Sequence, residues 1–267
     1  MSGAHFFFAF VGILKRELLR FTNQRSRFFA ALVRPLIWLL IFAAGFRAAL
    51  GISIIPPYET YITYEVYIIP GLIGMIQLFN GMQSSLSMVY DQEMGSMRIL
   101  LTAPLPRWYL LFCKLLAGVT VSLVQIYCFI AISYFIGIEL PLLGVVLILP
   151  ALIISGLMLG ALGMLIASTI RQLENFAGVM NFVIFPMFFL STALYPVWKM
   201  REASNLLANI CQWNPFSQAV ELVRFTLYGQ LNIEALAVVI ASGLTFFLLA
   251  VWSYNPASSF RAKRISA

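Results

Sequence analysis

The chain has 267 residues, of which 61% are hydrophobic and only 10% are charged. Its mean hydropathy of +0.92 lies far above the range of soluble domains, which excludes an ordinary soluble enzyme. The one histidine, His5, excludes His-based catalytic triads and histidine metal clusters, and the absence of a Gly-Lys dipeptide excludes a P-loop nucleotide site. We therefore expect a membrane protein that is not itself an enzyme and that holds no cofactor.

The first predicted element is an amphipathic helix near the N-terminus. Its apolar stretch, Phe6–Leu14, is too short to cross a bilayer, and the charges of Lys15 and Arg16 follow it, which is the wrong order for a cleaved signal peptide. At helical spacing, apolar and basic side chains fall on separate faces. The pattern predicts a helix lying on the cytoplasmic membrane surface. The alternative is a helix that extends the first span inward.

Six long apolar stretches follow, each with about 20 or more residues, which is enough for a helix to cross a hydrocarbon core of about 30 Å. They cover Phe28–Leu50, Tyr67–Met88, Leu110–Ile136, Leu142–Ala167, Phe176–Tyr195 and Glu234–Ser253. A helix satisfies its own backbone hydrogen bonds in lipid. The sequence therefore predicts an all-α integral membrane protein with six transmembrane helices. Because no other segment is long enough for a soluble domain, residues 1–267 form one transmembrane domain in this interpretation.

The formal net charge of +7 is distributed unevenly over the loops. Most of the 17 basic residues lie near the two termini and in the second and fourth loops, and only Arg47, Lys199, Arg201 and Arg224 fall on the other set of segments. The positive-inside rule places both termini in the cytoplasm, which indicates a multi-pass protein of the cell (inner) membrane. The basic residues then anchor lipid headgroups, and no nucleic-acid partner is expected.

The first outer loop carries Tyr58, Tyr61, Tyr64 and Tyr67 at intervals of three. Tyrosines at headgroup level form interfacial belts, and this is the interpretation that the spacing favours. The alternative is a stacking surface for sugars or flat apolar substrates.

The second cytoplasmic loop has more apolar character than a simple connection needs. Met97, Leu100 and Leu101 recur at helical spacing after the carboxylates of Asp91 and Glu93, which favour a helix N-terminus, and two prolines end the segment. The pattern predicts a short amphipathic helix parallel to the membrane that docks into a groove of another protein. The alternative is a helix resting on lipid headgroups.

On the fourth span, Gly156 and Gly160 form a G-x-x-x-G motif that Gly163 continues. Small residues at this spacing let helices approach closely. We expect packing within the chain, with dimerisation as the alternative.

The outer segment Pro196–Ile233 contains two apolar pieces that are each too short to span, separated by a turn at Trp213-Asn214-Pro215. On the second piece, Glu221 and Arg224 stand three residues apart on a polar stripe and can pair. The pattern predicts a half-inserted hairpin that returns to the outer face. The alternative is a surface helix with a solvated ion pair.

These motifs together resemble the permease subunit of the type-2 ABC exporters, a family of drug-resistance, nodulation lipo-oligosaccharide and polysaccharide export permeases. The resemblance covers nearly the whole six-span plan. Its local motifs are Pro70-Gly71 at the second span; Glu93-Met94-Gly95-Ser96, Leu100-Leu101 and Pro104 in the cytoplasmic loop; and Asn214-Pro215-Phe216 with Arg224 and Gly229 outside. The family frequently has an acidic residue at the position of Arg98.

The resemblance implies a homodimer that forms the pathway for an amphipathic or lipid-linked substrate, with ATP and Mg bound by two separate ATPase subunits. It implies an ATPase-coupling helix with residues Glu93, Gly95, Ser96, Arg98, Leu100, Leu101 and Pro104, and an outer hairpin with Asn214, Pro215, Phe216, Glu221 and Arg224. Membrane lipid is the remaining partner. The alternative is a channel or ion-coupled secondary transporter without an ATPase partner.

Overall fold

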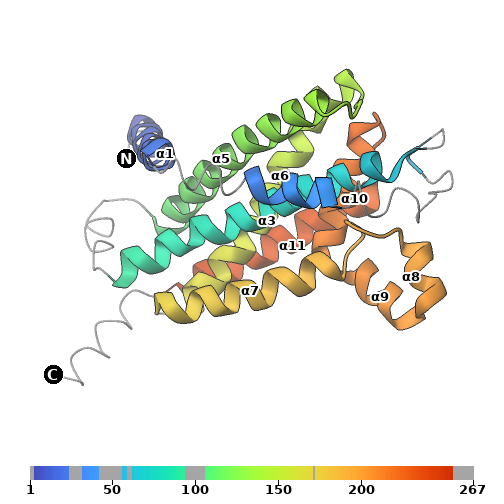
Figure 1. Cartoon of the computed structure of the whole chain (residues 1–267). Coiled ribbons are helices and arrows are strands. Elements are labelled where there is room, and N and C mark those ends of the chain that lie inside the picture. Colours follow the sequence, from blue (N-terminus) through green and yellow to red (C-terminus); the bar gives the residue numbers. More distant parts are fainter. Residues whose placement is uncertain are drawn as a thin grey trace.

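The computed structural model describes residues 3–23, 32–41, 56–58, 62–93, 106–170 and 172–254, and the regular structure within these ranges is helical (Figure 1). Four of its helices are long and apolar enough to cross a membrane: α3 (Tyr64–Glu93), α5 (Arg107–Phe135), α6 (Leu142–Thr169) and α11 (Ile233–Ser253). Two shorter apolar helices cover Leu32–Ile41 and α7 (Leu173–Phe189). An all-helical membrane protein is therefore confirmed, and the layout of six full spans stays a prediction.

The boundaries of the helices follow the apolar stretches to within three residues, with two larger differences. α3 continues through Glu93 instead of ending at Met88, and α7 ends at Phe189 instead of Tyr195. The predicted end of the fifth span is wrong because residues 190–195 form a turn, and its carbonyl oxygens accept hydrogen bonds from Asn214 and Arg224. The helix Leu32–Ile41 lies inside the predicted first span, and the rest of that span lies outside the described residues.

α6 is the central helix, because it packs against α3, α5, α10 and α11. Its glycines allow close approaches, among them the one to α3. A Cβ atom on Gly163 would lie only 2.7 Å from the carbonyl oxygen of Gly81 on α3, and a Cβ on Gly81 would lie 3.0 Å from the backbone nitrogen of Gly160. The predicted packing of the G-x-x-x-G stripe within the chain is confirmed.

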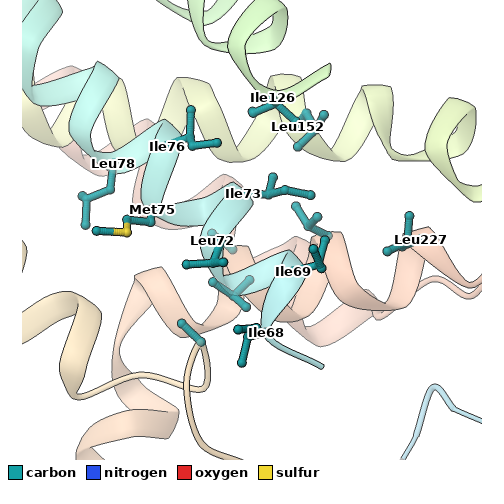
Figure 2. Close-up of a cluster of buried hydrophobic side chains, with 14 of the residues drawn as sticks. Ile68, Ile69, Leu72, Ile73, Met75, Ile76, Leu78, Ile126, Leu152 and Leu227 are labelled. Carbon is teal, nitrogen blue, oxygen red and sulfur yellow. The ribbon is translucent and has the colours of Figure 1, made fainter. Parts of the chain in front are cut away.

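The core lies mainly on α3, which is buried along most of its length, whereas α11 is mostly exposed. Ile68, Ile69, Leu72 and Ile73 of α3 are fully buried. Figure 2 shows them beside side chains of α5, α6 and α10. α11 therefore presents most of its apolar surface outward, as expected for a helix that faces lipid.

α1 (Gly3–Asn23) runs across the bundle. Figure 1 shows it nearly end-on, whereas α3, α5 and α7 are seen from the side. It packs on the start of α5, where the Tyr109 hydroxyl donates a 2.6 Å hydrogen bond to the Phe6 carbonyl and the two rings meet edge to face. Phe7 and Val11 of its predicted apolar face are exposed. The orientation of α1 across the long helices favours a helix on the membrane surface over an inward extension of the first span.

The segments that the charge pattern assigns to one side of the membrane lie at one end of the bundle. α1, the end of α3, the start of α5 and the end of α11 share that end (Figure 1). α8 (Val197–Ala203), α9 (Asn205–Trp213) and the start of α10 (Pro215–Leu227) lie toward the opposite end. The helices therefore separate the predicted cytoplasmic and outer segments.

Candidate functional site

The turn predicted at Asn214-Pro215 connects α9 to α10 and ties both to α7. The Asn214 side chain caps α10 by accepting a 2.9 Å hydrogen bond from the Phe216 backbone, and Pro215 occupies the first helical position, which suits its fixed φ. The same side chain donates 2.8 Å hydrogen bonds to the carbonyls of Met187 and Leu190 at the end of α7. One amide therefore satisfies polar groups of two helix ends.

α10 is packed inside the protein rather than lying on its surface. Its apolar residues Phe216, Val220, Val223 and Leu227 are fully buried, and it contacts α3, α6 and α11. The helix ends where Gly229 adopts a positive φ of 73°, a conformation that L side chains rarely adopt. The alternative of a surface helix with a solvated ion pair is therefore wrong.

Arg224 is a buried cation on α10, only 2% exposed. Its Nη1 pairs with the Glu221 carboxylate, its Nη2 donates a 2.8 Å hydrogen bond to the Thr192 carbonyl, and its guanidinium lies 4.2 Å from the centre of the Tyr67 ring. Burial is the largest single effect and would lower the pKa of Arg224, but the Glu221 carboxylate, Tyr67 and Tyr58 together outweigh it, so the pKa is raised and the side chain stays charged.

Tyrosines surround this pair. The Tyr67 hydroxyl donates a 3.0 Å hydrogen bond to the Thr192 carbonyl, and the Tyr64 hydroxyl donates a 2.9 Å hydrogen bond to the Leu194 carbonyl. Burial raises the pKa of Tyr228 to about 12, so its hydroxyl is neutral near pH 7. We name the set formed by Tyr58, Tyr67, Thr192, Ser217, Glu221, Arg224 and Tyr228 the Arg224 cluster.

This arrangement corrects the interpretation of the first outer loop. Tyr58, Tyr64 and Tyr67 are buried against protein, so these three side chains form neither a lipid belt nor an open stacking surface, and Tyr61 lies outside the described residues. Gly71 allows the start of α3 to approach the turn at residues 190–195 closely, because a Cβ at Gly71 would collide with the backbone of Ala193. The start of α3 and α10 therefore hold the turn at residues 190–195 from two sides.

A second polar group, which the sequence analysis did not single out, lies inside the bundle. Asn80 of α3 donates to the Gln125 side chain of α5, and Ser155 of α6 donates a 2.7 Å hydrogen bond to Gln77 of α3. Such bonds between helices contribute about 1 kcal/mol each in membranes. A cavity of about 50 Å³ beside Asn80, Gln125 and Lys114 has room for a few water molecules.

Of the predicted coupling residues, only Glu93 lies within the described part of the chain. Glu93 is the last residue of α3, whereas Gly95, Ser96, Arg98, Leu100, Leu101 and Pro104 lie outside the described residues. α3 runs through Asp91 and Glu93, so both residues belong to the last turn of a long helix. The short helix predicted after them lies outside the described residues and stays a prediction.

The described residues form a multi-pass helical membrane protein in which Arg224, buried and paired with Glu221, holds the turn at residues 190–195. The chain matches the ABC-2 type transporter family over residues 9–228, and it therefore belongs to that family. It is a permease component of the ABC transporter class.

Named relatives agree with this membership. The chain is 26% identical over 216 residues to a putative transport permease, ycf38, of Porphyra purpurea. The matched region covers 80% of this chain and 72% of the relative. It is 29% identical over 170 residues to the probable multidrug ABC transporter permease YbhR of Escherichia coli K12, covering 62% of this chain and 45% of the relative. It is 33% identical over 82 residues to nodulation protein J of Rhizobium leguminosarum bv. viciae, covering 31% and 30%.

Proposed function

We propose that the chain is the transmembrane subunit of an ATP-driven exporter of the inner membrane, with six spans and both termini in the cytoplasm. Two copies form the pathway, and two separate ATPase subunits bind ATP and Mg. The chain itself is one membrane domain over residues 1–267 without a cofactor. The observation that carries this proposal is the family match over residues 9–228, which runs from α1 to the end of α10.

The ATPase contact is assigned to the segment from Glu93 to Pro104. The position of this segment supports the assignment: the end of α3 and the start of α5 flank it, at the same end of the bundle as α1 (Figure 1). α1 is the second proposed contact with the ATPase. The outer hairpin, with the Arg224 cluster at its base, inserts partway into the membrane and caps the exit.

The proposed substrate is an amphipathic or lipid-linked molecule. The long helices are apolar and rich in aromatic residues, and the relatives named above include a multidrug permease and a nodulation protein. An apolar pathway suits a substrate with a hydrocarbon portion, since burial of apolar surface is favourable.

The test is reconstitution of the chain in liposomes with an ABC ATPase from the same organism, using a fluorescent headgroup-labelled phospholipid as the probe. We expect a stable complex, ATP hydrolysis that depends on the chain, and probe translocation that requires ATP. If no complex forms and an ion gradient alone moves the probe, the chain is a channel or ion-coupled carrier and the proposal fails.

A further inference from the structure

An apolar groove runs along the side of the bundle formed by α5, α6 and α11. α5 and α11 both pack on α6 but scarcely touch each other, so α6 forms the floor between them. The floor residues Ile154, Leu157 and Ala161 recur at helical spacing. Gly243 lets α11 pack closely on this floor, because a Cβ there would lie 3.2 Å from the Cβ of Met158. The groove has a volume of about 430 Å³.

The surroundings of the groove select a hydrocarbon occupant. Its lining consists of aliphatic, aromatic and methionine side chains on three helices that are each long enough to span a membrane. α11 is mostly exposed, so the groove opens toward the hydrocarbon core of the bilayer rather than toward water. An apolar cavity of about 150 Å³ holds a benzene ring. This groove therefore has room for a lipid chain.

One end of the groove is lined by an interfacial aromatic residue whose neighbour in the sequence is a cation. Trp108 in the first turn of α5 lines the groove and is 52% exposed, and the exposed Arg107 precedes it. Phe112 of α5 meets Phe247 of α11 with ring centres 6.2 Å apart, which joins the two walls one turn deeper. Tryptophan favours the headgroup level, and a guanidinium binds phosphate oxygens in a bidentate manner. Charge complementarity therefore selects an anionic headgroup.

We propose that this groove binds one hydrocarbon chain of an anionic membrane phospholipid, with the headgroup at Arg107. The lipid is a resident of the transporter and not its cargo. The proposal goes beyond the export function and does not depend on the ATPase partner, because it rests only on α5, α6 and α11.

The test uses the fluorescence of Trp108 in the full chain. Replacing Trp38, Trp198, Trp213 and Trp252 with Phe leaves Trp108 as the single reporter, and the protein is reconstituted in vesicles of phosphatidylcholine with brominated phosphatidylglycerol or brominated phosphatidylcholine. Bromine on the acyl chain quenches tryptophan on contact. We expect the brominated anionic lipid to reach half-maximal quenching at about a fivefold lower mole fraction, since one cation near the surface favours an anionic lipid by that factor.

A second chain that keeps only Trp252 is the matched control. Trp252 lies in the last turn of α11, is 84% exposed and does not line the groove, so both brominated lipids should quench it equally. Arg107→Gln in the Trp108 chain should remove the anionic preference, and Arg201→Gln on α8, toward the opposite end, should leave it unchanged.

Three results would overturn the proposal. If neither lipid quenches Trp108, protein covers the groove. If the two lipids quench Trp108 equally, the groove holds unselected annular lipid. If Trp252 shows the same anionic preference, the effect belongs to the whole membrane surface. None of these results bears on ATP-dependent export, which is measured separately.

Discussion

Thr192 is hydrogen-bonded to two helices at the predicted outer end of the molecule. Its carbonyl oxygen accepts hydrogen bonds from Tyr67 of α3 and Arg224 of α10, and its backbone nitrogen donates a 3.2 Å hydrogen bond to Ser217. A turn outside regular structure needs such partners when it is buried, because unpaired backbone groups are costly there. The polar stripe of α10 therefore satisfies the turn at residues 190–195.

Removing Arg224 should destabilise the protein strongly. Arg224→Ala leaves the Glu221 carboxylate, whose side chain is only 20% exposed, without its partner, and breaking a buried pair in this way costs about 3–5 kcal/mol. The double change with Glu221→Ala should be milder than Arg224→Ala alone, because no unpaired charge remains. Thermal unfolding of the purified variants measures both effects, and transport assays should follow the same order.

The control for that series is Arg201→Ala on α8, where the side chain is exposed and its loss should change unfolding by less than about 0.5 kcal/mol. Small and additive effects of the Arg224 and Glu221 changes would mean that water reaches the pair, contrary to the structure.

A smaller effect is expected at Tyr67. Tyr67→Phe removes one hydrogen bond to Thr192 but keeps the ring beneath the Arg224 guanidinium, so unfolding should be easier by about 1 kcal/mol. Tyr90→Phe near the other end of α3, where the side chain is exposed, is the matched control and should have no measurable effect. Equal loss in the two variants would show that the hydroxyl of Tyr67 is not satisfied by the turn.

At the scale of elements, apolar length and turn chemistry predicted most helix positions. α6 and α11 begin within a residue of the prediction, and Asn214-Pro215 starts α10 as the pattern indicates. The end of α7 was not predictable in this way, because Ser191 and Thr192 stand among apolar residues and the turn there is held by hydrogen bonds with α3 and α10, which are distant in the sequence. The continuation of α3 from the predicted end at Met88 to Glu93 was likewise not indicated by the apolar pattern.

The contact between α3 and α6 depends on small residues. Gly163→Ala places a Cβ against the Gly81 carbonyl and the Ser85 hydroxyl, so we expect a loss of about 1–3 kcal/mol from overpacking. Gly178→Ala on α7 meets no atom within 4 Å and should be neutral or slightly stabilising, because alanine favours a helix. Thermal unfolding of the two variants side by side separates packing from helix propensity. A similar gain in both would show that α3 and α6 tolerate a wider separation.

The segment between α3 and α5 is the proposed docking site for the ATPase. Replacing Leu100 and Leu101 with Asp should leave membrane insertion intact but abolish the ATP hydrolysis that the chain stimulates in its partner, because an uncompensated charge buried at an interface costs several kcal/mol. Replacing the exposed Leu206 and Leu207 of α9 with Asp introduces the same charges toward the opposite end and is the control for insertion. Full ATPase activity in the Leu100 and Leu101 variant would remove this segment from the docking site.

For the molecule as a whole, the fold class was readable from the sequence and the Arg224 cluster was not. Glu221 and Arg224 lie one turn apart, so their pairing followed from helical spacing. Tyr67 and Thr192 lie 125 positions apart, and nothing local indicated that a tyrosine of α3 and a carbonyl after α7 would meet one guanidinium. Pairwise chemistry within a helix is predictable, whereas contacts that join three segments depend on the packed bundle.

The two ends of the bundle should face opposite sides of the membrane. Glu174, exposed at the start of α7, belongs to the predicted cytoplasmic end, and Glu202, exposed on α8, belongs to the outer end. In a background with the three native cysteines replaced, a membrane-impermeant maleimide should label Glu202→Cys in intact cells, but Glu174→Cys only after permeabilisation. The physical reason is the basic-residue bias, which favours retention of the segments around α1, Arg171 and the C-terminus in the cytoplasm. Labelling of both positions from outside, or of Glu174→Cys alone, would refute this orientation and with it the proposed cytoplasmic docking of the ATPase.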